Sequence, residues 1–309
     1  EWYGDKPAIM GTDVIVELWY EEQEADALRV IQKVMSEMRR VDQQFSPYIE
    51  SSELSALNRW ASDKDSYAKP MPVSSELFNL LADAQAISRL SDGAFDITFA
   101  SVAQFYDYRK GIKPDQNKIA QQLPAINYQH ILLNRQDRSV RFKRPGVSID
   151  LGGIAKGYAV DQGIGILKTM AIEHANVSAG GDSRLLGDRR GRPWLTGIKD
   201  PRSEEEMAVL MPLENTAVST SGDYERFFID GDTRYHHILH PKTGDSAREV
   251  RSVTILGEDA ITTDGLSTTV FVLGVEQGLA LVNRLPGIDA VIIDNLGKLH
   301  YSVELERPE

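Results

Sequence analysis

The sequence predicts an α+β fold in which mostly antiparallel sheets pack against surrounding helices. Short strand-like segments bounded by turn residues occur along most of the chain, and a few longer segments have the apolar spacing of packed helices. No internal repeat, low-complexity tract or Pro/Ser linker divides the 309 residues. We therefore expect a single compact domain over residues 1–309, and leave open a division into two lobes, about 1–150 and 151–309.

The first part of the chain predicts one strand and then helices. Residues 12–20 alternate apolar and polar positions, which is typical of a half-buried strand. Residues 22–45 place their apolar positions on one helical face, and residues 74–91 form a second amphipathic helix behind a serine N-cap. Between them, Ser51 to Leu54 has the pattern of a short helix start.

The remaining chain predicts mainly strands. A helix entered through glycines is expected over about 154–170, and a third helix over about 264–284. The predicted strands are 129–134, 138–142, 147–151, 175–179, 194–199, 208–211, 217–220, 226–230, 234–239, 251–257, 289–294 and 298–304.

The composition excludes several classes of function. Lys and Arg number 34 against 46 Asp and Glu, a net charge of −12, so we expect no nucleic-acid binding. The absence of cysteine excludes thiol nucleophiles and zinc–thiolate sites. The chain starts at Glu1 and contains no apolar run of 18 residues, so we expect a processed or truncated form with no membrane-spanning segment.

The segment from Asp150 to Gly157 predicts a strand end, a glycine turn and a helix start. A helix N-terminus presents unpaired N–H groups and partial positive charge, which suit a phosphate, and Lys156 adds a mobile ammonium group. Asp150 could accept a hydrogen bond from a ligand. The alternative is structural: the glycines let strand and helix pack closely.

Asp264 and Thr268 are four residues apart and share one face of the third helix, at its predicted first turn. A carboxylate and a hydroxyl form a donor pair suited to Mg²⁺ when phosphate oxygens complete the shell. Capping is the alternative, with Asp264 complementing the helix dipole and Thr262 or Thr263 as the N-cap.

Three of the six histidines, His236, His237 and His240, lie within five residues. Zinc binding is chemically possible, although no accompanying ligand spacing predicts it. A histidine just before the turn at 241–244 could instead act as a base or a phosphate donor.

Two aromatic residues could stack on a ligand ring. Phe95 follows a predicted helix, and its alternative is a core position. Tyr48 lies in a predicted loop, and its alternative is an ordinary turn residue.

Eight segments occur in order from Met10 to the strand around Ile292–Asp294. They are MGT, FSPY with SELSALN, DGAFDIT, IDLGGIAKGYAVD, SAGGDS, STSGDYERFF, HHILHPKTG and TTDGLSTTVFVLG. Each alone is weak evidence, whereas eight in register are specific. Together they resemble the ApbE-type FAD:protein FMN transferase family over nearly the whole chain, which implies a flavin-binding fold of antiparallel sheets and surrounding helices.

The resemblance implies a Mg²⁺-dependent reaction that splits FAD at its pyrophosphate. FMN would pass to a Thr or Ser hydroxyl of a target protein, and AMP would leave. The implied acceptor is a flavoprotein subunit of a membrane redox pump or an exported reductase. The family also implies a periplasmic location and an N-terminal lipid anchor, whose cysteine is absent from this sequence.

The resemblance further implies roles for individual residues. The metal would be held by the Asp264 and Thr268 side chains and the carbonyl of Gly153. His237 would accept or orient the proton of the target hydroxyl, with Asp264 as an alternative base. The implied flavin contacts are Met10, Tyr48, Ala94, Phe95, Asp96, Asp150, Lys156 and Ile238.

Two other functions remain open at this point. A Mg²⁺-dependent FAD pyrophosphatase would use the same site with water in place of the protein hydroxyl. A non-catalytic flavin-binding lipoprotein would need neither a metal nor a base, so the presence of Asp264, Thr268 and His237 argues against it.

Overall fold

The computed structural model describes residues 1–203 and 205–306 and confirms the predicted fold class. The main sheet has nine strands in the order β1-β3-β7-β8-β11-β14-β15-β16, with β2 paired to β3, and its neighbouring strands are antiparallel. These strands are β1 (Trp2–Asp5), β2 (Ala8–Ile9), β3 (Thr12–Trp19), β7 (Ala175–Ala179), β8 (Asp182–Leu186), β11 (Ala217–Gly222), β14 (Val250–Gly257), β15 (Asp289–Asp294) and β16 (Leu299–Tyr301).

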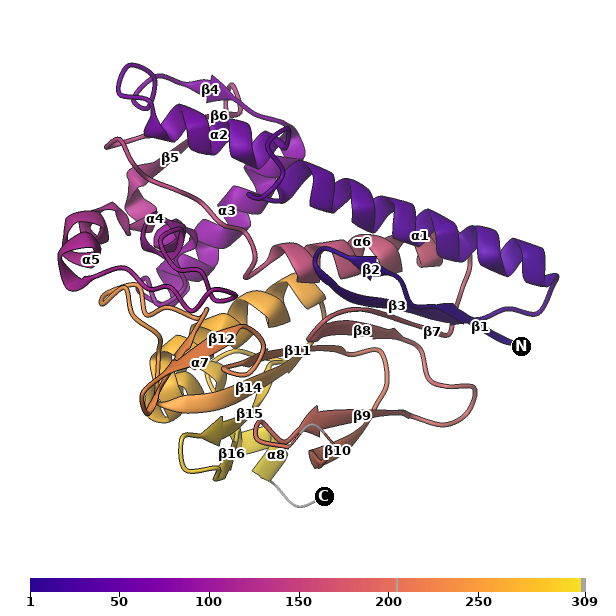
Figure 1. Cartoon of the computed structure of the whole chain (residues 1–309). Helices are drawn as coiled ribbons and strands as arrows, with labels where there is room; N and C mark the ends of the chain where they lie inside the picture. Colours follow the sequence, from indigo (N-terminus) through magenta and orange to yellow (C-terminus); the bar gives the residue numbers. More distant parts are fainter. Residues whose placement is uncertain (204, 307–309) are drawn as a thin grey trace.

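Three smaller antiparallel sheets and eight α-helices complete the described chain (Figure 1). The small sheets are β4 (Met71–Pro72) with β6 (Ser139–Phe142) and β5 (Ile131–Asn134), β9 (Trp194–Lys199) with β10 (Met207–Leu213), and β12 (Phe227–Asp230) with β13 (Thr233–His236). The helices are α1 (Glu24–Phe45), α2 (Glu53–Ser62), α3 (Ser75–Leu90), α4 (Ala100–Ala103), α5 (Gln116–Gln122), α6 (Ala155–Thr169), α7 (Ala260–Val282) and α8 (Val303–Glu306).

Helices cover one face of the main sheet. Helix α1 lies along α6, α6 packs on β7 and β8, and α7 continues this layer over β11, β14 and β15 (Figure 1). The apolar face predicted for α1 is buried, including Val34 and Met38. The opposite face of β14 and β15 is covered by the β9–β10 hairpin through Ile198 and Met211.

Local polar residues start the helices as expected. The Ser74 hydroxyl accepts from the backbone N–H of Leu77 and caps α3, and Ser52 caps α2 in the same way through Ser55.

Helix α7 is long and apolar enough to cross a membrane, but 61% of its most apolar stretch is buried inside the molecule.

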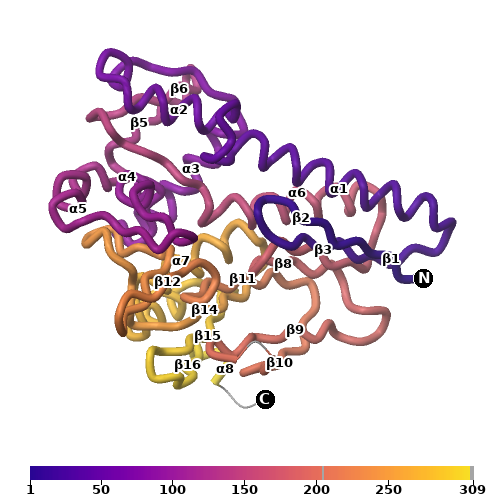
Figure 2. Tube along the Cα trace, viewed as in Figure 1, coloured from indigo at the N-terminus to yellow at the C-terminus, as the bar shows by residue number. Residues whose placement is uncertain are grey.

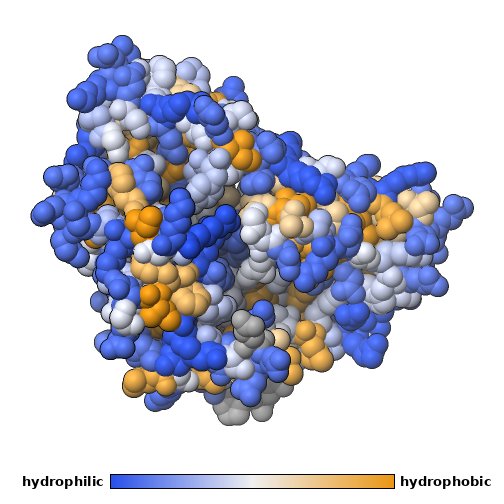
Figure 3. Space-filling model, in the orientation of Figure 1, coloured by the Kyte–Doolittle hydropathy of each residue, from blue (hydrophilic) through white to orange (hydrophobic). Residues whose placement is uncertain are grey.

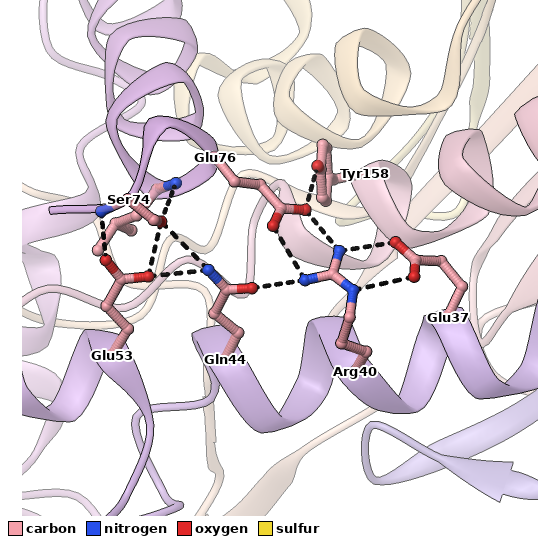
Figure 4. Close-up of polar contacts among 8 residues, drawn as sticks. Glu37, Arg40, Gln44, Glu53, Ser74, Glu76 and Tyr158 are labelled. Carbon is pink, nitrogen blue, oxygen red and sulfur yellow. Dashed lines mark hydrogen bonds and ion pairs between the residues drawn. The ribbon is translucent and has the colours of Figure 1, made fainter.

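An ion network joins α1 to two other helices (Figure 4). The Arg40 guanidinium on α1 donates to Glu37 and to Glu76 of α3 at distances of 2.6 to 2.9 Å. Glu76 also accepts from the Tyr158 hydroxyl of α6. These charge-assisted hydrogen bonds link α1 to α3 and, through Glu76, to α6.

Several predicted elements differ from the structure. The predicted strand 234–239 ends at His236, and the predicted strand 129–134 begins only at Ile131. Residues 147–151 are extended but form no strand, because Ile149 N–H bonds the Asn58 side chain and Asp150 N–H bonds the Ile97 carbonyl rather than a neighbouring strand. The end of the predicted strand 298–304 instead forms α8.

The trace in Figure 2 shows how the two halves of the chain interlock. Strand β3 from the N-terminal end pairs with β7, so the main sheet contains strands from both sides of residue 150. The proposed division into lobes of about 1–150 and 151–309 stays a prediction.

Candidate active site

One cavity of about 1570 Å³ brings together all twelve residues that the sequence predicted for the site. Its lining includes Met10, Tyr48, Ala94, Phe95, Asp96, Asp150, Gly153, Lys156, His237, Ile238, Asp264 and Thr268. The volume exceeds that of most small-molecule sites and leaves room for a dinucleotide. The roles assigned to the individual residues stay predictions.

The cavity floor is formed where α6 begins against the first turns of α7. A Cβ atom on Gly157 would lie 2.2 Å from the carbonyl oxygen of Ala260, so a glycine is needed for this close approach. Through the same contact, Gly157 N–H donates to Asp264 Oδ2 at 2.9 Å. One N–H at the start of α6 is therefore already used by the carboxylate predicted to bind the metal.

Helix α7 starts four residues before the predicted position, and the capping alternative for its first residues is wrong. Asp259 is the N-cap and accepts from Thr262 N–H at 2.9 Å. The Asp161 carboxylate of α6 accepts from the first two donors of the helix, the N–H groups of Ala260 and Ile261. Asp264 is thus left in the second turn and is not required for capping.

The three predicted metal ligands lie in adjoining segments of this floor. A Cβ atom on Gly153 would lie 3.6 Å from Thr268 Oγ1 and 3.0 Å from the Phe95 ring. Phe95 is only 3% exposed and belongs to the main hydrophobic core, so its core alternative is supported. The ring therefore supports the glycine turn from below.

A buried group of charges surrounds the floor. Lys156 Nζ lies 3.5 Å from the carboxylate of Asp182, which is 2% exposed. Burial raises the pKa of Asp264 well above its usual range, and the charge of Asp182 raises it further. Burial opposes the charge on Lys156, but Asp264, Asp182 and Glu225 together raise its pKa. Two cations, the Lys156 ammonium and the Arg226 guanidinium, thus lie near three carboxyl groups.

This excess of acid is consistent with a cation site. Among the described residues, no three His, Asp or Glu side chains form a group that could hold a metal ion. The predicted donor set contains one carboxylate, one hydroxyl and one carbonyl, which fits a Mg²⁺ ion that keeps water and takes further oxygens from a substrate phosphate.

His237 lies at the side of the cavity, held by its backbone. Its N–H donates to the Arg226 carbonyl at 3.1 Å, and its Nε2 lies 4.0 Å from the Glu225 carboxylate. Within the described chain its buried Nδ1 atom has no hydrogen-bond partner. Burial, assisted by the Arg226 guanidinium, lowers the pKa of His237 to about 3, so the ring is neutral at neutral pH.

The neighbouring histidines do not build a zinc site. Both ring nitrogens of His236 are used, since Nε2 contacts the Ala247 carbonyl at 2.6 Å and Nδ1 accepts from Ile238 N–H. His240 Nδ1 accepts from Lys242 N–H in the following turn. These rings stabilise the loop that presents His237 and Ile238 to the cavity.

The predicted flavin contacts have different environments. Tyr48 is 79% exposed and presents its ring at the cavity, as a stacking residue would. The Asp96 carboxylate is already bonded to Thr98 and to Tyr128 N–H, so it stabilises the loop. Asp150 Oδ1 accepts from Gly152 N–H at 2.7 Å. Met10 has a φ of 58° in a turn that brings it to the lining.

The sequence analysis assigned no role to three charged residues of the lining: Asp182, Glu225 and Arg226. Asp182 follows two glycines and Glu225 follows a polar turn, and neither local pattern by itself indicates a site residue. Their convergence on Lys156 and His237 depends on strand pairing between β7, β8 and β11, which local patterns do not specify.

The chain is similar to known proteins over most of its length. The model of the ApbE family matches residues 10–292. The chain is 30% identical to an FAD:protein FMN transferase of Klebsiella pneumoniae over 94% of this chain and 89% of that protein. It is 29% identical to one of Treponema pallidum, over 94% and 84% of the two chains.

Solved structures give the same result. The crystal structure of an ApbE protein from Thermotoga maritima has a TM-score of 0.89 and 34% identity, and all of both chains is covered. The flavin transferase ApbE from Vibrio cholerae has a TM-score of 0.87 and 27% identity, with 99% and 98% of the two chains covered.

Proposed function

The chain belongs to the ApbE family, and on this premise we propose that it transfers FMN from FAD to a Thr or Ser hydroxyl of an acceptor flavoprotein and releases AMP. The observation that carries the proposal is one large cavity, in which the start of α6, the Asp264–Thr268 face of α7 and His237 meet. Phosphoryl transfer depends mainly on alignment and charge stabilisation, which such a site provides.

Asp264, Thr268 and the Gly153 carbonyl would hold Mg²⁺ beside the FAD pyrophosphate. The ion would supply positive charge to the phosphate oxygens and to the leaving AMP. Support comes from the buried acid excess around Lys156 and from the closeness of Gly153 to Thr268. Lys156 would bind a phosphate oxygen, and the hydrogen bond from its Nζ to the Gly152 carbonyl of the glycine turn at 3.2 Å supports this role.

His237 would accept the proton of the acceptor hydroxyl. A ring that is neutral at neutral pH has a free lone pair, and Glu225 at 4.0 Å would stabilise the imidazolium that forms. Asp264 is a poorer base in this role, because one of its oxygens is bonded to Gly157 and the other is assigned to the metal.

The acceptor and the location follow from the resemblance alone. A subunit of a membrane redox pump or an exported reductase would be the acceptor. The enzyme would work in the periplasm, held to the membrane through a lipid anchor that the given sequence does not contain.

Product analysis tests the proposed function. The protein is incubated with FAD and Mg²⁺, with and without an apo-flavoprotein acceptor, and the acceptor is viewed under ultraviolet light on a denaturing gel. Transfer predicts a fluorescent acceptor band and an equal amount of AMP. Free FMN and AMP at the same rate without acceptor would instead identify a pyrophosphatase.

A further inference from the structure

The β9–β10 hairpin has two apolar faces, although one of them is not packed. On the inner face, Ile198 and Met211 are buried against the main sheet. On the outer face, Leu195 is 73% exposed, Leu210 63% and Met207 52%. A solvated face of an antiparallel ribbon is normally polar, so three large apolar residues there indicate a binding surface.

Strand register makes these residues neighbours. Leu210 lies opposite Gly197, and Leu195 lies opposite Pro212. The Met207 thioether covers Gly197, where a Cβ atom would lie 2.7 Å from the sulfur. Figure 3 shows the corresponding orange surface over β9, in the lower part of the molecule. We name Leu195, Met207, Leu210 and Pro212 the hairpin patch.

The hairpin patch is continuous with the mouth of the cavity. Leu195, Gly197 and Lys199 lie on the same face of β9, and all three also line the cavity. Burial raises the pKa of Glu225, and the positive charge of Lys199 lowers it. This electrostatic interaction means that Lys199 lies near Glu225. Glu225 is in turn 4.0 Å from His237. A path thus leads from the patch to the predicted base.

We propose that the hairpin patch docks the acceptor polypeptide beside its Thr or Ser, with apolar acceptor side chains on Leu195, Met207 and Leu210. This inference rests on the proposed function, which requires a protein substrate at the mouth of this cavity. Lys199 is the one basic residue on this face of the described hairpin strands, in a chain of net charge −12. An acidic residue of the acceptor beside the apolar contact would pair with it.

The test uses residues of the patch that do not line the cavity. Met207→Thr/Leu210→Thr removes the apolar contact but keeps strand propensity. The matched controls are Leu210→Met, which keeps the apolar surface, and Leu296→Thr, which changes an 86% exposed leucine at the β15–β16 turn. The probe is the water-soluble domain of a redox-pump flavoprotein subunit, prepared without flavin, at saturating FAD and Mg²⁺.

The KM of the double variant for the acceptor should be at least about tenfold higher than that of the parent. Its kcat, its KM for FAD and its melting temperature should stay close to the parental values. Both controls should behave as the parent. An acceptor KM within twofold of the parent would overturn the proposal. A raised FAD KM would also overturn it, because the patch would then belong to the flavin site. Loss of a dimer in light scattering would assign the patch to a second copy of this chain.

The two levels of the account fail differently. If the parent enzyme splits FAD but never labels the acceptor, the proposed transferase function fails, and the docking proposal falls with it. If the parent labels the acceptor and the double variant does so with unchanged KM, only the docking proposal fails.

Discussion

Two clusters of charged residues in this molecule differ in the direction in which the pKa of their carboxyl groups is shifted. In the network of α1, Arg40 meets Glu37 and Glu76, and the pKa of Glu76 is lowered chiefly by the Arg40 hydrogen bond (Figure 4). At the cavity floor, burial raises the pKa of both Asp182 and Asp264, and Lys156 does not offset it. The first group stabilises the fold, whereas the second keeps carboxyl groups whose charge is disfavoured by burial, which is consistent with the cation site proposed above.

Removing Asp264 should separate these two roles most clearly. Asp264→Asn should lower Mg²⁺-dependent turnover by about 10³-fold or more, because the metal loses its one charged protein ligand. In EDTA the variant should melt no lower than the parent, because a buried uncompensated acid is gone. Turnover at the parent rate, or activity independent of added metal, would contradict the assignment.

His237→Gln tests the base without altering the charged floor. We expect transfer to fall by about 10²- to 10⁴-fold while FAD binding stays close to that of the parent. Stopped-flow transfer and FAD titration measure the two effects. An unchanged transfer rate would remove His237 from the mechanism.

Gly157→Ala would force apart the two helices that form the floor. The new methyl group would lie 2.2 Å from the Ala260 carbonyl, so the contact must open. We expect a loss of about 1–3 kcal/mol in unfolding free energy and reduced turnover, since Asp264 moves with α7. Gly165→Ala is the matched control, because no atom lies within 4 Å of its added carbon. Equal stability of the two variants would contradict this account.

Glu76→Gln should give the opposite result to Asp264→Asn. The loss of the Arg40 and Tyr158 partners should cost about 0.5–1.5 kcal/mol of stability, a modest value because Arg40 is 44% exposed. Turnover should stay within about twofold, because Glu76 does not line the cavity. A lower melting temperature with parental turnover is the expected outcome, and loss of turnover at parental stability would break the comparison.

Acidification should change the stability contributions of the two groups in opposite directions. A raised pKa means that folded Asp264 and Asp182 hold protons that the unfolded chain has released, so their contribution improves as pH falls from neutral toward their unfolded pKa. Glu76, with a lowered pKa, contributes above its unfolded pKa and loses this only in stronger acid. Melting curves of parent, Asp264→Asn and Glu76→Gln in EDTA measure the difference. A parent that loses stability relative to Asp264→Asn on mild acidification would contradict it.

The sequence predicted features that depend on nearby residues and missed features that depend on contacts between distant segments. The helix face of α1 and the caps at Ser52 and Ser74 depend on residues within one or two turns, so local patterns predicted them correctly. The start of α7 was placed too late because its local N-cap, Asp259, was not recognised. The other donors of its first turn bond Asp161, almost 100 residues away, which no local pattern could predict. Asp182 and Glu225 were not recognised, because their environment is created by the pairing of strands distant in sequence.

The central claim is that Asp264, Thr268 and the Gly153 carbonyl hold a divalent ion against the FAD pyrophosphate. Anomalous diffraction from a crystal soaked with FAD and Mn²⁺ tests it most directly. The account predicts one strong peak between these three groups, in contact with the diphosphate, and no such peak in Asp264→Asn. A diphosphate bound elsewhere in the cavity, with the ion away from Asp264, would contradict it.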